Sequence, residues 1–323
     1  MEVSTDTPKS IWSQILAILG KNPRLSVFLI LAVISTALSK GIFLSPANLH
    51  NMLRQYAGIG IMAVGQTFAI LLAGVDLSQG SVVALVSMIL AYLNTSGCGI
   101  VWPLVVGLCA GAACGLTSGL IVTRGKVPPF IATLAMASIA RGIATLITQA
   151  RPVYGLSKEL LVFGRGTVGG IGIQILVWAN VALLGVFLLT RTVYGREVYI
   201  VGGNERSANL SGINAHRVKL LAYVLSGMCA ALAGIVITSK LDMGGPYISL
   251  TDNVQSVASV VIGGTSFAGG RGSISGTIVG TLIIAMMNNL MNLMLINPYI
   301  QQGIIGAIIL LTVTMNQRKA GVR

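Results

Sequence analysis

The stretch Val201-Gly-Gly-Asn-Glu-Arg-Ser-Ala-Asn-Leu-Ser-Gly212 is a polar, glycine-bearing block between two long apolar segments. The basic residues in and around it are Arg191, Arg196, Arg206, Arg217 and Lys219. Short loops that are rich in Lys and Arg stay on the cytoplasmic side of a membrane. The block therefore predicts a cytoplasmic loop of a membrane protein, and its small residues at defined positions indicate a surface on which a cytoplasmic partner docks.

The composition of the whole chain agrees with a membrane protein. Of its 323 residues, 54% are hydrophobic and 9% are charged, and the mean hydropathy is +0.86. Soluble domains carry about 25% charged residues, so a soluble core of this length could not bury so much apolar surface. The 40 glycines fit the close helix packing of membrane bundles, where lipid supplies no hydrophobic drive between helices.

Apolar runs bounded by turn or charge signals follow one another along the chain and predict an all-α, polytopic membrane protein with about ten transmembrane helices. Several runs are shorter than a bilayer-spanning helix, so we expect some helices to be broken, re-entrant or tilted. The runs are 25–44, 56–73, 81–93, 100–123, 128–148, 171–190, 218–238, 254–267, 274–296 and 299–315.

Most of the 21 Lys and Arg residues fall on one side if the N-terminus is cytoplasmic. This orientation makes both termini and residues 191–219 cytoplasmic and places residues 150–170 in the periplasm. Residues 1–24 are then a cytoplasmic segment, residues 25–315 a single transmembrane domain, and residues 316–323 a cytoplasmic tail. The first 24 residues are mixed polar and carry Glu2 and Asp6, so we expect no cleaved signal peptide.

The net charge of +13 is also typical of nucleic-acid-binding proteins. The basic residues here stand singly at the ends of apolar segments, with no aromatic residues interleaved, so nucleic acid is not an expected partner. The cysteines Cys98, Cys109, Cys114 and Cys229 form no pair with zinc-ligand spacing, and we expect small packing residues and no metal.

The segment Gly74-Val-Asp-Leu-Ser-Gln-Gly-Ser81 interrupts a region that is otherwise uncharged. A polar break in apolar sequence is tolerated where protein or a water cavity satisfies its backbone, which predicts a broken helix beside a transport path. The alternative is a cytoplasmic turn in which Asp76 or Ser78 caps the next helix. Both interpretations stay open on the sequence alone.

Other polar side chains stand within apolar runs. Gln66, Asn288, Asn289 and Asn292 are neutral, and Asn288 and Asn292 share a helix face because they are four residues apart. Neutral donors and acceptors suit a sugar-like solute, so we predict Gln66, Asp76, Ser78, Asn288 and Asn292 along a substrate path; helix–helix hydrogen bonding is the alternative. Arg141 is the one cation within a run and is either functional, snorkelling or capping a carbonyl.

The glycine-dense stretch 263–272 resembles a nucleotide-binding loop only superficially, because no G-x-x-x-x-G-K-[ST] motif occurs and no βαβ unit surrounds it. We expect a tight re-entrant turn packed against its neighbours. Enzyme classes are also poorly supported. The histidines His50 and His216 fall in loops, and Asp76 is the one acid at helix depth, which excludes a pair of intramembrane catalytic acids and disfavours ion coupling.

Several motifs in one order resemble the ribose-type sugar permeases of bacterial ATP-binding cassette (ABC) importers. In chain order they are Ile61–Gly65, Gly74–Ser81, which is similar to G-[IV]-D-L-S-x-G-S, Pro129–Leu134, Gly202–Glu205 with Leu210–Ile213, and Val261–Ser266 with Gly269–Gly272. The similarity covers about residues 25–315. One departure is Gln79, which stands where an apolar residue is frequent.

The resemblance implies an all-helical permease of the type II importer kind, two copies of which form a pore as a homodimer. It implies a cytoplasmic ATPase pair that uses ATP and Mg, a periplasmic sugar-binding protein, and no cofactor on this chain. It also implies a coupling loop with an acidic residue, a small residue and then glycine, roles that Glu205, Ala208 and Gly212 fit, with the coupling helix following Gly203.

We therefore predict the permease subunit of a monosaccharide importer in the bacterial inner membrane, which does no covalent chemistry itself. The related alternative is an ABC permease for branched-chain amino acids, for which Arg141 is the only in-span candidate to bind a carboxylate. The alternative from another class is a self-sufficient secondary carrier. Ribose, allose and related sugars are not distinguished by the sequence.

Overall fold

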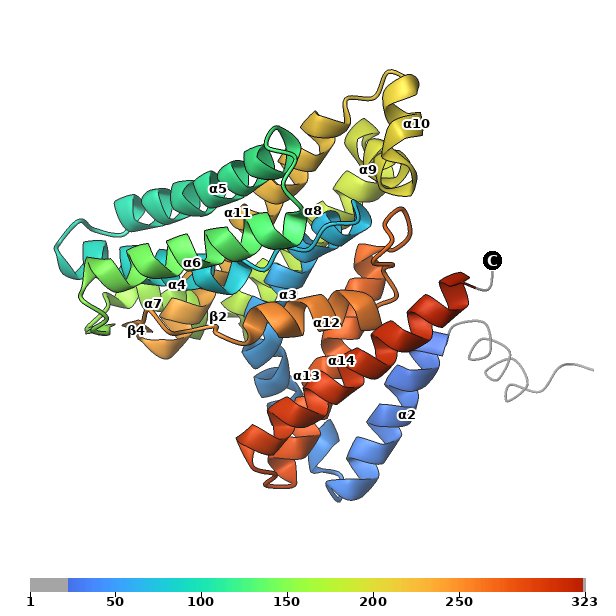
Figure 1. Ribbon diagram of the computed structural model, residues 1–323. Coiled ribbons are helices and arrows are strands. Elements are labelled where there is room, and N and C mark those ends of the chain that lie inside the picture. The colour runs from blue at the N-terminus through green and yellow to red at the C-terminus, as the bar shows by residue number, and fades with distance from the viewer. Residues whose placement is uncertain (1–22, 322–323) are drawn as a thin grey trace, which may run out of the picture.

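Each apolar run of the sequence becomes a helix in the computed structural model, which describes residues 23–321 (Figure 1). The helices that match the runs are α2 (Pro23–Leu38), α3 (Pro46–Leu71), α4 (Gln79–Thr95), α5 (Val101–Thr123), α6 (Pro129–Ile147), α8 (Ile173–Arg191), α11 (Ala215–Leu241), α12 (Asp252–Ile262), α13 (Ile274–Leu293) and α14 (Pro298–Gly321). The all-helical architecture predicted from the sequence is confirmed.

Short elements connect these helices. They are the 3-10 helix η1 (Ile42–Leu44), the helices α7 (Lys158–Arg165), α9 (Val193–Gly203) and α10 (Glu205–Leu210), and two-residue strands in antiparallel pairs, β1 (Val153–Tyr154) with β4 (Met243–Gly244) and β2 (Thr167–Val168) with β3 (Ile171–Gly172). Local caps start several helices: the Ser45 hydroxyl accepts a hydrogen bond from Asn48 N at α3, and the Ser273 hydroxyl accepts one from Gly276 N at α13.

Among residues 23–321, five helices are long and apolar enough to cross a membrane, namely α5, α6, α8, α11 and α13. The helix α4 has 17 residues and α12 has 11, so α12 extends about 16 Å and cannot cross a hydrocarbon core of about 30 Å. The expectation that some apolar runs form incomplete crossings is therefore confirmed for α12. The chain is a multi-pass membrane protein.

Burial separates central helices from lipid-facing ones. In the apolar window of α11, 67% of residues are buried, against 28% in each of α5, α6 and α8. Large apolar side chains cover the outer surfaces of α6 and α8, including Phe130, Ile131, Leu134, Ile139, Leu183, Leu184 and Phe187. Exposed apolar area of this extent is typical of a surface whose solvent is lipid.

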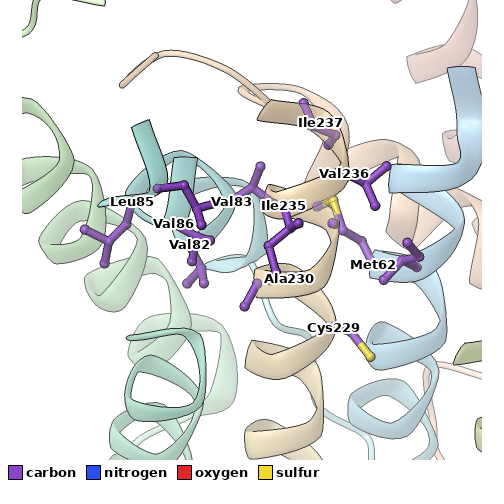
Figure 2. Packing of buried hydrophobic residues seen from close by; sticks show 14 of the residues in the cluster. Met62, Val82, Val83, Leu85, Val86, Cys229, Ala230, Ile235, Val236 and Ile237 are labelled. Carbon is purple, nitrogen blue, oxygen red and sulfur yellow. The ribbon is translucent and has the colours of Figure 1, made fainter. Parts of the chain in front are cut away.

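The centre of the bundle is formed by α3, α4 and α11, which share one apolar cluster (Figure 2). Met62 of α3 and Val83 of α4 are both fully buried in it, together with Ala230 on α11. Because α11 contacts both other helices, it is the element around which the rest of the bundle is arranged.

The helices α5 and α11 approach each other closely along a glycine seam, formed by Gly111, Gly115 and Gly119 at four-residue spacing. A Cβ added at Gly115 would clash with the backbone carbonyl of Tyr223, and one added at Gly111 would lie 2.6 Å from the Gly227 oxygen. Small residues at every fourth position let backbones touch, as in membrane helix pairs generally. This seam explains the high glycine content at one specific contact.

The boundaries predicted for the ends of the chain are only partly within the described residues. The segment 1–24 lies almost entirely outside them. The helix α14 continues to Gly321, so most of the segment 316–323 that we predicted as a tail is helical. After Pro298 the sequence contains no further proline, and its isolated glycines, Gly303, Gly306 and Gly321, are tolerated in a helix.

Candidate functional site

The segment Gly74–Ser81 lies inside the bundle and breaks the path of the chain between α3 and α4. The helix α3 ends at Leu71, Ala73 adopts a left-handed conformation with φ of 55°, and α4 begins only at Gln79. The Gln79 amide nitrogen donates a hydrogen bond to the Met62 carbonyl, at 3.0 Å, so α4 starts beside the middle of α3. Of the two interpretations left open by the sequence, the structure supports the intramembrane break.

Hydrogen bonds satisfy the carboxylate of Asp76, which is 1% exposed. Its Oδ1 accepts from the backbone nitrogen of Ser78 at 2.9 Å and from the Ser78 hydroxyl at 2.6 Å. Its Oδ2 accepts from the Ser226 hydroxyl of α11, also at 2.6 Å. Since an isolated buried carboxylate is costly, these donors are what allow Asp76 to stand at this depth.

Gln79 extends the same network to two further helices. Its amide nitrogen also donates to the Ser226 hydroxyl oxygen at 2.9 Å, and its Oε1 accepts from Ser256 of α12 at 3.0 Å. With its amide oriented to suit its neighbours, Gln66 donates to the Asp76 carbonyl at 3.1 Å and to Gln79 Oε1 at 3.3 Å, and accepts from the Asp76 backbone nitrogen at 3.1 Å. The network thus ties the break to α3, α11 and α12.

We predict that Ser226→Ala lowers the stability of the protein by about 1–3 kcal/mol, because it leaves Asp76 Oδ2 buried without its donor. The matched control is Ser239→Ala, since Ser239 is also buried on α11 but donates only within its own helix, to the Ile235 carbonyl. Thermal unfolding of both purified variants checks this. Equal midpoints would show that the network does not hold the break.

The short helix α12 begins where α4 begins. The Asn253 amide donates to the Leu77 carbonyl of the break at 3.3 Å, and the Ser249 carbonyl is so close to Gly80 that an added Cβ there would clash. Two incomplete helices therefore start near one point inside the bundle. Irregular backbone at membrane depth occurs only where protein buries it or where it borders a cavity.

The structure separates the asparagines of α13 from the buried network. Asn288 is 7% exposed, donates to the Ile284 carbonyl within its own helix, and lies within hydrogen-bonding reach of the Tyr56 hydroxyl. Asn292 is exposed and accepts from the Gln301 amide at 2.9 Å. Asn289 instead pairs with Asn48 of α3 through two amide hydrogen bonds of 2.9 Å. Gln66, Asp76 and Ser78 are thus brought together, whereas Asn288 and Asn292 lie elsewhere.

Arg141 of α6 caps carbonyls, which was one of the roles the sequence allowed. Its Nη1 donates to the Pro246 carbonyl at 2.5 Å and to the Ile248 carbonyl at 3.3 Å. The guanidinium therefore holds the loop between β4 and α12 in place. That loop contains Ser249, which adopts a left-handed conformation with φ of 56°.

The polar block that opened the sequence analysis forms a protruding pair of short helices, α9 and α10, at one end of the bundle (Figure 1). The glycine-dense turn 263–272 packs beneath it, as expected of a tight turn. The backbone nitrogen of Gly270 donates to the Leu71 carbonyl at 2.8 Å, and the Tyr199 hydroxyl donates to the Gly272 carbonyl at 2.9 Å. Burial raises the pKa of Tyr199 above its ordinary value, so this donor keeps its proton.

The residues assigned to coupling lie on α10 or beside its two ends and differ in their exposure. Gly203 and Glu205 are exposed, and Gly212 is exposed and left-handed with φ of 83°. Ala208 is completely buried against the cluster that contains Ala215, so it seats α10 on the bundle. Asn204 starts the helix because its side chain accepts from Ser207 N.

A large exposed apolar residue at the end of α10 escaped the sequence analysis. Leu210 is 83% exposed, and it stands in a polar segment outside the apolar helices. The signal in the sequence was a lone Leu within a polar block, which by itself does not indicate exposure. Such a residue, on a helix that protrudes from the bundle, is suited to bury its apolar side chain against a partner.

The loop between α5 and α6 lies beside α10 and the start of α11. One hollow is lined by Lys126, Glu205, His216 and Lys219, and the adjoining one by Arg124 and Arg217 among others. The Lys219 ammonium pairs with Glu205 at 2.5 Å. The structure thus gathers the basic residues of two separate loops at one end of the bundle.

Comparison with known proteins agrees with this architecture. Residues 48–313 match the family model described as the branched-chain amino acid transport system / permease component. Over 300 residues the chain is 38% identical to a ribose import permease protein of Bacillus subtilis, covering 92% of each chain. It is 36% identical to a D-allose transport system permease protein of Escherichia coli, over 90% of each chain.

A xylose transport system permease protein of Escherichia coli is 32% identical, with 92% of this chain and 93% of that protein covered. No solved structure matches the chain. The family match covers most of the chain and the identities extend over nearly its whole length. The chain therefore belongs to the family of branched-chain amino acid transport system permease components, and it is a transport subunit and not an enzyme.

Proposed function

We propose that this chain is the membrane subunit of an ATP-driven importer for a monosaccharide such as ribose, allose or a related sugar. The observation that carries the proposal is the similarity to a ribose import permease over 92% of both chains. The arabinose and xylose permeases among the relatives extend the substrate class to other monosaccharides. The relatives named here favour a sugar over the amino-acid alternative.

The partners follow from this function. A cytoplasmic ATPase binds and hydrolyses ATP with Mg, and a periplasmic binding protein delivers the sugar, so this chain needs no cofactor of its own. A second copy of the chain completes the pore as a homodimer in the bacterial inner membrane, with both termini in the cytoplasm. The protruding helix α10, with Gly203 and Gly212 at its two ends, is suited to contact the ATPase.

Coupling between ATP and transport is then mechanical. Closure of the ATPase pair pushes α10, and Ala208 transmits the push because it is packed against the interior of the bundle. The Tyr199 and Gly270 hydrogen bonds join α9 and the end of α3 to the turn that follows α12. A rigid-body change of this kind alternates access between the two sides of the membrane.

For the substrate path, we retain Asn288 and Asn292 as candidate contacts. Gln66, Asp76 and Ser78 contribute to the path by holding the break between α3 and α4, since their polar atoms bond to one another and to α11. A transient sugar needs hydrogen bonds of modest strength, because a tight site slows release.

The orientation predicts opposite labelling of two exposed loops. In a variant without the native cysteines, Ser207→Cys should react with a maleimide only after the membrane is permeabilised, because residues 191–219 are cytoplasmic. Val168→Cys, which lies between α7 and α8, should react in intact cells with a membrane-impermeant reagent. Strong labelling of Ser207→Cys in intact cells would reverse the orientation.

If Asn288 and Asn292 contact the sugar, replacing them should impair transport without impairing folding. Asn292→Leu should cut sugar uptake per folded permease severalfold while yield and ATPase binding stay normal, and Asn288→Leu should do the same. Asn289→Leu is the contrasting variant, because Asn289 makes a structural pair with Asn48 and its loss should lower stability by about 0.6–2 kcal/mol. Wild-type uptake per molecule by both Asn288→Leu and Asn292→Leu would place the path elsewhere.

Uptake in cells tests the substrate class. A strain that lacks its own pentose importers is given the permease, its ATPase and its binding protein, and labelled sugars are offered one at a time. We expect uptake of at least one of ribose, allose, arabinose and xylose, competed by the unlabelled sugar and not by leucine. Leucine uptake without sugar uptake would establish the amino-acid alternative.

A further inference from the structure

A cavity of about 290 Å³ lies at the end of α11 that is remote from the coupling helices. It is bordered by α3, by the last turn of α11 and by the first turn of α12, and its lining includes Tyr56, Lys240, Asp252 and Gln255. The helix α11 is 27 residues long, about 40 Å, so the cavity and the coupling loop are on opposite sides of the membrane core.

A buried polar atom without a hydrogen-bond partner lies in the wall of the cavity, behind its surface. Gln255 Oε1 is shielded from solvent and has no hydrogen-bond partner within residues 23–321. Leaving a buried acceptor unsatisfied costs about 1–3 kcal/mol, so such a group indicates a place where a ligand or water supplies the donor. Space equivalent to roughly ten waters of ~30 Å³ each is more than one bridging water needs.

The remaining lining combines apolar and polar surfaces. Ile59 and Ile237 form an apolar wall beside the Tyr56 ring, which is 5% exposed. On the other side, Lys240 and Asp252 line the cavity with opposite charges, so the cavity presents both donors and acceptors. A monosaccharide has the matching surfaces, with C–H groups on its ring faces and hydroxyls around its edge.

The loop that closes the cavity is held in a fixed, strained shape. Arg141 binds the Pro246 and Ile248 carbonyls, and Ser249 next to them is left-handed. Strained backbone that the surrounding structure enforces is characteristic of ligand sites. Gln55 and Leu241 are exposed at the rim and mark an opening toward the side on which α7 lies.

We propose that this cavity is a binding station for a monosaccharide on the side opposite the coupling loop. Asp252 accepts hydroxyl hydrogens there, the Gln255 side chain turns its Oε1 toward the sugar to accept another, and Tyr56 packs on the sugar ring. This inference rests on the proposed function and names the first contacts within the permease. It also connects Asn288 to the path, because Asn288 lies against the Tyr56 hydroxyl behind the cavity.

Cysteine protection tests the station directly. In the complete transporter without native cysteines, Gln55→Cys at the rim should react with a maleimide severalfold more slowly when the transported sugar is present. Val168→Cys is the control, because it is 60% exposed in the loop between α7 and α8 and should react at an unchanged rate. Unchanged labelling of Gln55→Cys in a transporter that imports the sugar overturns the station while leaving the proposed function intact.

If the same transporter imports no sugar, the proposed function itself fails, so the two failures are distinguishable. Protection of Gln55→Cys by leucine and not by sugar would also overturn the inference, because a zwitterion could pair with Lys240 and Asp252.

Gln255→Leu separates a binding role from a structural one. Removing the unsatisfied amide should leave the thermal midpoint unchanged or raise it, whereas the sugar concentration that half-protects Gln55→Cys should rise about fivefold, the loss expected for one hydrogen bond. A lower midpoint with unchanged protection would show that Gln255 serves only the fold and would overturn its assignment as a sugar contact.

Discussion

Gly115→Leu is expected to abolish most of the folded permease, with a destabilisation of about 3 kcal/mol or more. The new side chain would have to occupy space held by the backbone of Tyr223 and Val224 on α11. Backbone atoms cannot rotate aside as a flexible side chain can, so α5 and α11 would have to separate. Because α11 is the central helix, the whole bundle should lose its packing. The fraction of purified protein that elutes as a single species, and its thermal midpoint, measure the effect.

Gly142→Leu on α6 is the matched control, because a Cβ at Gly142 meets no atom within 4 Å. It makes the same exchange in a helix of the same membrane domain but at an exposed position. We expect its midpoint to stay close to that of the wild type. If both variants unfold alike, the cost comes from losing glycine in a helix, and the close α5–α11 seam does not determine stability.

Leu210→Asp is expected to release the ATPase from the membrane subunit while the permease stays folded. Burial of a Leu side chain contributes about 2 kcal/mol, so its replacement by a charged group should weaken the complex roughly thirtyfold. Leu210 contributes little to the fold because it is 83% exposed. Co-purification of the ATPase with the tagged permease, together with sugar uptake, measures the loss.

Leu295→Asp provides the comparison for this variant. Leu295 is 92% exposed and follows α13. The helix α13 begins near the coupling end and extends about 30 Å, so Leu295 lies at the opposite end of the bundle. The same exchange at that end should leave ATPase retention unchanged. Full retention of the ATPase by Leu210→Asp would remove the end of α10 from the interface.

The helices could be predicted from the sequence because each one is an apolar run bounded by charges or turn residues. The length of a run also carried information, since the short run at 254–267 became the incomplete helix α12. The intramembrane position of Asp76 was predictable only as one of two alternatives. Its buried donor, Ser226, is separated from it by 150 residues, and no local pattern indicates such a contact.

The cavity could not be predicted, because its lining comes from positions that look unrelated along the chain. Lys240 and Asp252 appear to belong to loops between apolar runs, whereas the structure places them at the end of α11 and the start of α12. The register of the glycine seam was equally hidden, although the abundance of glycine was not. Both features depend on how helices pack, which composition and periodicity do not specify.

The central claim is that this chain moves a monosaccharide only when an ATPase drives it, and transport into sealed proteoliposomes tests it most directly. The permease is reconstituted with its ATPase, ATP and Mg are supplied on the side of α10, and the binding protein with labelled sugar on the other side. We predict accumulation of at least one of ribose, allose, arabinose and xylose that requires ATP, the ATPase and the binding protein together. Accumulation by this chain alone without ATP would contradict the account, as would transport of leucine but of none of these sugars.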